Sequence, residues 1–136
     1  MKTITIETKR NRKMFEFAKR MALMNSDSGK FRHGAVLARH GVILNASHNK
    51  NRACSFGSRF RCKTKGQATI HAELGAILNM SRDSTENADI YVIRINTEGE
   101  SRNSMPCPMC QEAMRFVGIK RVFYSSENGT FEMMKL

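Results

Sequence analysis

Apolar side chains recur at helical spacing between residues 11 and 24, which predicts an amphipathic helix over this stretch. Asn11 is expected to cap the helix at its start. The letters GAVLA (34–38) and VILNA (42–46) predict two short strands, and the glycine between them predicts a tight turn. The segment 50–67 has no convincing period and is rich in Arg, Lys, Ser and Gly, so a long loop is expected there.

The pattern then changes between helical and strand spacing. The letters HAELGAILNM (71–80) predict a second helix. DIYVIRI (89–95) is a run of β-branched and aromatic residues, which is typical of a buried strand. Residues 96–105 are mostly polar and are expected to form a connection.

The last third of the chain predicts a helix followed by a hairpin. The helix is expected between Pro108 and Gly118, because proline suits the first turn of a helix and glycine its end. RVFYS and TFEMMKL predict two strands around a turn at Asn128-Gly129. The resulting order, α-β-β-α-β-α-β-β, favours one mixed sheet with helices on both faces.

Composition limits the classes of protein to consider. At 136 residues the chain is long enough for a single domain, residues 1–136, to bury a core without disulfides. No apolar run approaches the ~20 residues of a membrane span, and the N-terminus lacks the apolar core of a secretory signal. We therefore expect a cytoplasmic protein with no membrane segment, whose four cysteines stay reduced.

The net charge of +11 is unevenly distributed. Residues 1–70 hold 16 Lys and Arg against 3 Asp and Glu, whereas residues 71–136 hold 7 against 9. A basic front half suggests an anionic partner, either nucleic acid or a phosphorylated small molecule. A solvated surface explains the same charge about equally well, so charge alone does not decide.

The letters PCPMC place Cys107 and Cys110 at the start of the predicted third helix. Backbone dipoles and free N–H groups there favour the thiolate, which is the form that binds metal. A spacing of three brings both sulfurs to one side of the first turn, and His71, also at a helix start, can supply a nitrogen. These ligands leave the fourth tetrahedral position of Zn²⁺ open for water, as catalytic zinc requires.

Glu73 lies two residues after His71, in the same turn, and is not the obvious fourth ligand. A carboxylate beside an activated water can take its proton and later return it to a leaving group. The sequence holds no second CxxC or HxxxH pair to close a structural zinc site. The set therefore favours hydrolytic chemistry over a zinc finger.

The letters HAE and PCPMC, with this order of elements, resemble the cytidine/deoxycytidylate deaminase superfamily over residues 34–125. The resemblance implies a three-layer α/β/α fold with a five-stranded mixed sheet and an antiparallel C-terminal hairpin. It also implies that His71, Cys107 and Cys110 hold zinc and that Glu73 shuttles protons.

The same likeness extends to the substrate. Asn49, which follows the second predicted strand, would contact the sugar, and Ala72, between His71 and Glu73, would belong to the substrate site. Small members of this family usually assemble, so the resemblance also implies a homo-oligomer.

The implied reaction is hydrolytic deamination, in which activated water attacks C4 of cytosine, Glu73 protonates N3, and ammonia leaves to give uracil. The expected substrate is a free nucleotide or nucleoside, with dCMP first. The alternatives are a deaminase of cytidine in single-stranded DNA or RNA and, third, a tRNA adenosine deaminase. From a different class, a catalytically silent zinc-stabilised nucleic-acid-binding module would keep the cysteines but would have no use for Glu73.

The segment 50–65 carries six cations and no acid, with Phe56 and Phe60 among them. It leads into HAE and is expected to edge the active-site mouth. Three interpretations stay open: phosphate recognition on a nucleotide, a groove for single-stranded nucleic acid in which the rings stack on bases, or a solvated loop anchored by its rings. Arg52 in this segment and Arg94 at the end of the buried strand are candidate substrate contacts.

Five further residues have metal-binding or titratable side chains. Cys54 and Cys62, with His48, are candidates for a second zinc, although two ordinary reduced cysteines are the preferred interpretation. His33 and His40 flank the first predicted strand and are interpreted as surface residues.

Overall fold

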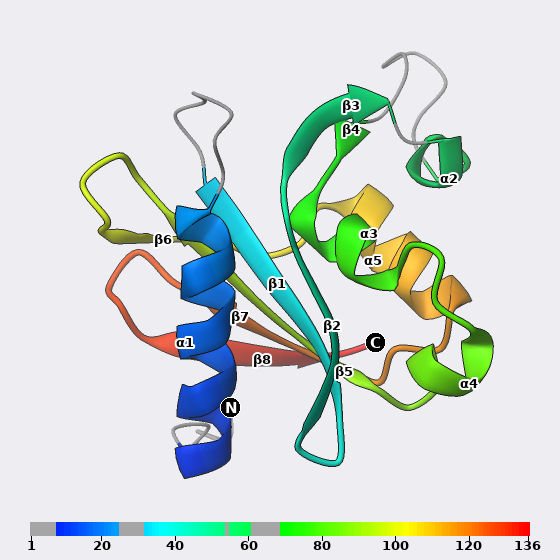
Figure 1. Ribbon diagram of the computed structural model, residues 1–136, viewed down its shortest axis with the longest axis horizontal. Coiled ribbons are helices and arrows are strands. Elements are labelled where there is room, and N and C mark those ends of the chain that lie inside the picture. The colour runs from blue at the N-terminus through cyan, green and yellow to red at the C-terminus, as the bar shows by residue number, and fades with distance from the viewer. Residues whose placement is uncertain (1–7, 25–31, 54, 61–68) are drawn as a thin grey trace.

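Strand β1 (Arg32–Arg39) lies inside the sheet because its apolar run can be buried on both faces. A computed structural model describes residues 8–24, 32–53, 55–60 and 69–136. In it, β1 pairs antiparallel with β2 (Val42–His48) on one side and with β5 (Asp89–Ile95) on the other. β5 pairs parallel with β7 (Arg121–Ser125), and β7 pairs antiparallel with β8 (Phe131–Lys135). The order β2-β1-β5-β7-β8 is the mixed sheet that the sequence predicts (Figure 1).

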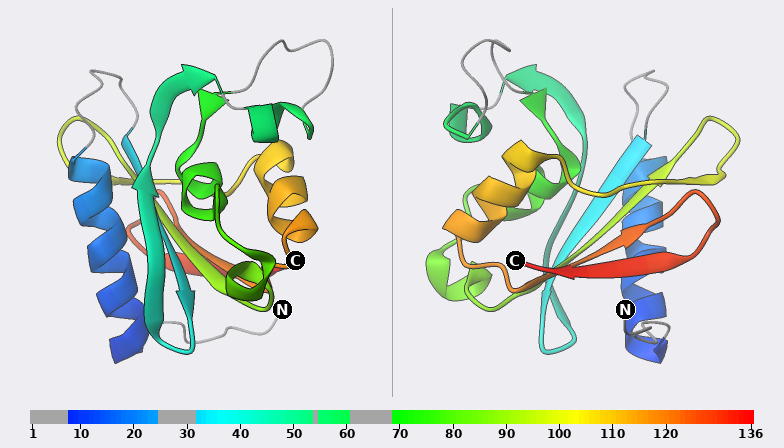
Figure 2. Two further views of the ribbon diagram at one scale, coloured as in Figure 1. Left: turned by 45° about the vertical axis from the view of Figure 1, so that its right-hand side comes forward. Right: turned by 180° about the vertical axis from the view of Figure 1, so that it is seen from behind.

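Alternation along the strands gives the sheet two apolar faces. Helix α1 (Lys9–Leu23) packs on one face, and α3 (Ala72–Ile77) and α5 (Pro108–Phe116) pack on the other. Alternate residues of β1 belong to different core clusters. Val36 and Ala38 pack under α1, whereas Ala35 and Leu37 pack under α3 and α5. Figures 1 and 2 show the helices on opposite sides of the sheet, which confirms the three-layer α/β/α arrangement.

The sheet has six strands, one more than predicted. The extra strand, β6 (Ser101–Arg102), pairs antiparallel with the end of β5, inside the stretch that was expected to be a polar connection. Two residues carry too little periodicity to indicate a strand. The predicted C-terminal hairpin of β7 and β8 is confirmed, and Gly129 in its turn has a φ of +76°.

The segment 50–67 contains regular structure, contrary to the predicted loop. β3 (Lys50–Ala53) is followed by α2 (Ser55–Ser58), and β3 pairs antiparallel with β4 (Thr69–Ile70) in a separate two-stranded sheet. The predicted helix at 71–80 is shorter than expected, because α3 ends at Ile77 and a one-turn helix, α4 (Arg82–Thr85), follows.

Helix α1 begins earlier than predicted, and its N-cap is Thr8 rather than Asn11. The Thr8 hydroxyl accepts a hydrogen bond from the backbone N–H of Asn11 at 3.0 Å. The side chain of Asn11 is instead buried, and its Oδ1 accepts a hydrogen bond from the Tyr91 hydroxyl at 2.6 Å. The local pattern could not reveal this role because the partner lies 80 residues away in the chain. No helix within the described ranges is both long and apolar enough to cross a membrane.

Gly34 in β1 is required by the close approach of α1. A Cβ atom at this position would lie 1.8 Å from the carbonyl oxygen of Ala18 and 2.7 Å from the backbone nitrogen of Ala22. Both are backbone atoms, so the helix would have to move away from the sheet. Gly34→Ala is therefore expected to lower the free energy of unfolding by about 3 kcal/mol, measured by urea denaturation.

A matched control for this substitution is Gly99→Ala. Nothing lies within 4 Å of a Cβ there, and only the φ of +80° opposes a side chain. The expected loss is about 1 kcal/mol. Equal losses at the two positions would contradict the steric explanation for Gly34.

Candidate metal centre and active site

Two helix starts meet on the face of the sheet that carries α3 and α5. β4 leads directly into α3, which has His71 as its N-cap residue, and α5 has Cys107 as its N-cap residue. Neither side chain makes a capping hydrogen bond to its own helix. Cys110 lies in the first turn of α5 and is fully buried, whereas Cys107 is half-buried.

The fold brings the three predicted metal ligands together. His71 Nδ1 lies 3.8 Å from Cys107 Sγ and 3.3 Å from Cys110 Sγ, and all three atoms lie within 4.8 Å of one another. Tetrahedral zinc, with Zn–N about 2.0–2.1 Å and Zn–S about 2.3 Å, would separate nitrogen from sulfur by about 3.6 Å. The two observed separations lie on either side of this value, so the donor set fits zinc.

The two cysteines have opposite pKa shifts. Hydrogen bonding from Cys110, and then from His71, lowers the pKa of the Cys107 thiol to about 4. The hydrogen bond to Cys107 and burial together raise the pKa of Cys110. Without a cation, the site therefore favours one thiolate, and the positive charge of a divalent ion would stabilise the second. The thiolate is the form of cysteine that binds metal, so the lowered pKa of Cys107 is compatible with a metal site.

Glu73 lies in the first turn of α3 and is only 5% exposed. Burial is the main reason that its pKa is raised above the ordinary value for a carboxyl group. The carboxyl group also interacts with His71, Cys107 and Cys110, so it borders the ligand cluster. A carboxyl group whose pKa is raised holds a proton more readily than an ordinary one, as a group that accepts and returns a proton must.

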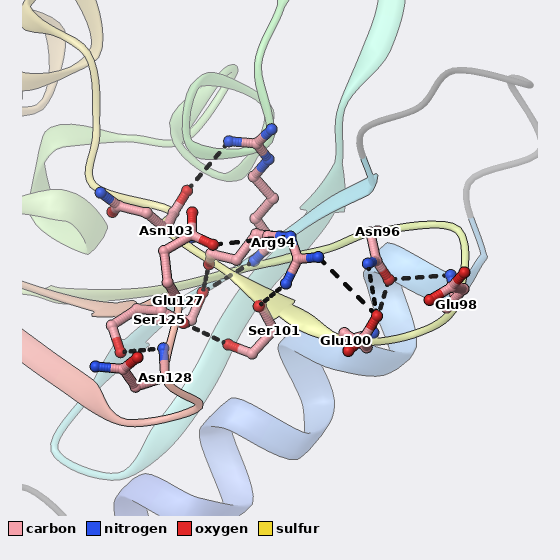
Figure 3. Close-up of polar contacts among 11 residues, drawn as sticks. Arg94, Asn96, Glu98, Glu100, Ser101, Asn103, Ser125, Glu127 and Asn128 are labelled. Carbon is pink, nitrogen blue, oxygen red and sulfur yellow. Dashed lines mark hydrogen bonds and ion pairs between the residues drawn. The ribbon is translucent and has the colours of Figure 1, made fainter.

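The segment that leads into Cys107 is held by two buried serines, which the sequence analysis did not identify. The Ser104 hydroxyl accepts a hydrogen bond from the backbone N–H of Ser125 at 2.7 Å and donates to the carbonyl oxygen of Val92 at 3.0 Å. Ser125 Oγ in turn accepts from the backbone N–H of Arg94 at 3.1 Å (Figure 3). These bonds fix the chain three residues before Cys107 against the ends of β5 and β7.

Asn49 lies at the same end of the sheet as the ligands. Its Oδ1 accepts a hydrogen bond from the backbone N–H of His33 at 3.0 Å, and its own N–H donates to the His33 carbonyl oxygen at 3.3 Å. Lys50 of β3 is paired with Ile70 of β4, so extending this antiparallel register by one residue sets Asn49 beside His71.

His33 was interpreted as a surface residue, and this prediction is wrong. It is half-buried, and it lies on the α3 and α5 face of the sheet because it shares the alternation of Ala35 and Leu37. Burial, and then the charges of Arg94 and His71, lower its pKa to about 4. The period-2 pattern of β1, extended by one residue, is the signal that could have indicated this position. His40 is exposed, as predicted.

The lowered pKa of His33 predicts a loss of stability in acid. The unfolded-state pKa is about 6.5 and the folded-state value about 4, so between these values the unfolded chain binds more protons. Stability is therefore full above pH 6.5 and falls as pH drops toward 4, by up to about 3 kcal/mol. Urea unfolding of the protein and of His33→Gln at pH 7, 6 and 5, at equal zinc concentration, measures this contribution.

The comparison between the two proteins isolates His33, because any acid-dependent loss of zinc is common to both. The wild type should lose more stability over this range than His33→Gln does. Parallel stability curves would contradict the assigned shift.

Of the remaining predicted substrate residues, the structure describes the side chains of Arg94 and Ala72 but not that of Arg52. Arg94 is the cross-strand partner of His33, and its Nη1 donates to the carbonyl oxygen of Asn103 at 3.4 Å (Figure 3). Ala72, the first residue of α3, is fully buried. Arg52 lies in β3, but its side chain is outside the described part of the structure, as are Cys54 and Cys62. The proposal of a second zinc therefore stays a prediction.

The two phenylalanines of the basic segment, residues 50–65, pack inward. Phe56 and Phe60 are half-buried against the core cluster under α5, with their ring centroids 5.3 Å apart. Arg59 lies between these rings and that of Phe116, with its guanidinium carbon 5.0 Å from the Phe116 centroid. These contacts support the interpretation in which the rings anchor the segment.

Comparison with known proteins gives a family match over most of the chain. The sequence model described as the cytidine and deoxycytidylate deaminase zinc-binding region matches residues 8–126. No curated protein matches the sequence significantly.

Several solved structures share the fold. The dCMP deaminase from the cyanophage S-TIM5 in apo form has a TM-score of 0.56 at 21% identity, over 83% of this chain and 79% of that one. The same enzyme in complex with dCMP and dUMP has a TM-score of 0.53 at 20% identity, over 90% of this chain and 83% of that one. RibD from Acinetobacter baumannii has a TM-score of 0.52 at 16% identity, over 85% of this chain but only 28% of that one. At these identities the likeness is one of fold.

Proposed function

Because the chain belongs to the cytidine and deoxycytidylate deaminase family, we propose that it hydrolyses cytosine to uracil in a free nucleotide or nucleoside, with dCMP first. In this reaction a C4–O bond forms, the C4–N bond breaks, and one water is consumed for each ammonia released. Residues 1–136 would act as a single zinc-dependent deaminase domain. The proposal rests on the buried Glu73 carboxyl group, which borders a ligand set that fits zinc.

The proposed mechanism assigns separate roles to the ligands and to Glu73. Zinc held by His71, Cys107 and Cys110 would supply Lewis-acid activation of the attacking water. Glu73 accepts the proton that this water loses and delivers it to N3 of the ring. It then takes the remaining proton from the hydroxyl group now on C4 and transfers it to the departing amine, so that the C4–N bond breaks and the C4 carbonyl of uracil forms. Burial suits Glu73 to this work because it raises the pKa of the carboxyl group above its ordinary value, which favours uptake of the proton.

The substrate would lie at the end of the sheet where β1 and β5 meet Asn49, the residue between β2 and β3. With Oδ1 of Asn49 held by the His33 N–H, the amide NH₂ is the group assigned to the sugar. Arg94, with Arg52 from β3, is assigned to the phosphate, and Ala72 to the wall of the base pocket. The fold likeness to a dCMP deaminase solved with dCMP and dUMP supports a nucleotide substrate.

A substrate panel tests the proposal. Ammonia release is followed with cytosine, deoxycytidine, dCMP, dCTP, a cytosine-bearing oligonucleotide and an adenosine-bearing tRNA. The highest kcat/KM is expected with dCMP, and a zinc chelator should abolish turnover until zinc is restored. Turnover of the oligonucleotide or the tRNA alone would overturn the proposed substrate class. No ammonia from any substrate, with zinc bound, would favour a silent zinc-stabilised module.

Two further properties are proposed from the family resemblance. A homo-oligomer is expected, and light scattering of the purified protein measures its mass directly. A cytoplasmic location is expected because the two ligand cysteines must remain reduced to bind metal.

A further inference from the structure

The solvent face of α1 carries most of the charge of that helix. Six cations are exposed along its 15 residues and only one acid, Glu16, stands among them. At 100° per residue, five of the cations fall on one stripe, and Arg10 lies beside it. We call these residues the basic stripe: Lys9, Arg12, Lys13, Lys19 and Arg20.

The basic stripe takes no part in packing α1 against the sheet. The packing of the helix comes from its opposite side, where Met14, Phe15, Ala18 and Ala22 are buried. Within the described ranges, no cation of the stripe forms an ion pair. Each is exposed to solvent.

The arrangement also works against the stability of the helix. Lys9 and Lys13 are four residues apart and repel each other, and the first turn has cations but no acid. The N-terminus of a helix favours negative charge, so this placement is unfavourable. A local rule broken with no structural gain indicates a ligand that supplies the missing negative charge.

The start of the stripe borders a shallow hollow. Lys9, Arg10, Arg12 and Lys13 line an open depression of about 890 Å³ together with the acid Glu16, and His40 of the β1–β2 turn lies at its side. Four cations around one open depression can contact several phosphate oxygens at once.

We propose that the basic stripe binds the phosphate backbone of nucleic acid, independently of the proposed deaminase site. The stripe runs about 16 Å from Lys9 to Arg20, and one strand of a duplex carries one phosphate per about 3.4 Å of helix axis. A row of exposed cations matches such a row of anions. The exposed large apolar side chains of α1, Leu23 and Met24, lie at its far end, so the stripe itself has none to insert into a membrane.

The position of the stripe separates this binding from catalysis. α1 covers one face of the sheet, whereas His71, Glu73 and Cys107 belong to elements on the other face (Figures 1 and 2). Nucleic acid on α1 is therefore a tether for the protein and not the substrate. Because the contacts are to phosphates, the binding is independent of base sequence.

Fluorescence anisotropy tests the proposal with probes that contain no cytosine. The probes are a labelled 20-nucleotide oligo(dT), a 20-base-pair dA·dT duplex, and vesicles of phosphatidylcholine with phosphatidylserine. The triple variant Lys9→Gln, Arg12→Gln, Lys13→Gln is compared with the control Arg82→Gln, Arg115→Gln, Lys120→Gln. The control removes the same charge from exposed positions in α4, α5 and the turn before β7.

The wild type and the control should bind nucleic acid alike, with steep salt dependence. The stripe variant should bind at least about 10-fold more weakly at 50 mM salt, with a salt slope smaller by about 2–3. Glu16→Gln should bind more tightly than the wild type. Preference for the strand or the duplex identifies which backbone is bound.

Several outcomes would overturn the proposal. These are no binding of either nucleic acid by the wild type, equal weakening by the stripe and control variants, or binding to vesicles alone. Deamination of dCMP by the stripe variant, measured in parallel, should equal that of the wild type. If neither the wild type nor the variants deaminated dCMP, this would count against the proposed function and leave the binding result valid.

Discussion

Glu73→Gln is expected to reduce deamination by about 10²–10⁴-fold while the protein keeps its fold and its zinc. The amide preserves the size of the side chain, so it can occupy the same buried position in α3. It cannot accept the proton of the attacking water or return it to the ring. The measurement is kcat for dCMP, alongside zinc content and the midpoint of thermal unfolding.

Glu86→Gln is the matched control for this prediction. Glu86 is exposed and follows α4, so the same change of charge there should leave turnover near that of the wild type. If Glu73→Gln kept more than about a tenth of the wild-type rate, acid–base catalysis by this residue would be wrong. If it lost zinc as well as activity, the loss of turnover could not be assigned to proton transfer, and the separate role given to Glu73 would be wrong.

Cys110→Ser is expected to abolish zinc binding and deamination together. Cys110 is fully buried and its sulfur lies 3.3 Å from His71 Nδ1, so serine fits the space but removes a soft ligand. Zinc affinity should fall by at least about 100-fold, because even the loss of an outer partner can cost 10–100-fold. A chelator should lower the thermal midpoint of the wild type and leave that of the variant unchanged.

The zinc content of a second variant is the control. Cys62→Ser should keep one zinc per chain and full turnover if the cysteines of the basic segment are ordinary thiols. Two zinc ions per wild-type chain, falling to one in Cys62→Ser, would establish the second site that the preferred interpretation rejects. Retention of zinc by Cys110→Ser would contradict the three-ligand set.

Features set by short stretches of sequence were predicted well. β5 spans the predicted residues because a continuous apolar run dictates a buried strand whatever its partners are. α5 begins at Pro108, where proline is favoured in the first turn of a helix. Two of the metal ligands, Cys107 and Cys110, could be predicted for the same reason, since a spacing of three in one helical turn fixes their relative positions.

Features that depend on distant partners were not predicted. Asn11 was predicted to cap the helix because its local position suits a cap. Its actual hydrogen bond, to Tyr91, comes from another part of the fold and could not be seen in the local pattern. The burial of His33 could have been inferred by extending the period-2 pattern of β1, but its contact with Arg94 depends on the pairing of β1 with β5. The contacts of Ser104 and Ser125 join the ends of two strands, and no local pattern marks them.

X-ray absorption at the zinc edge is the most direct test of the central claim, an open zinc site held by one imidazole and two thiolates. We expect one zinc per chain, with two sulfur ligands, one histidine nitrogen and a fourth ligand that the protein does not supply. Four protein ligands, a third sulfur among them, or a purified protein that takes up no zinc would contradict it.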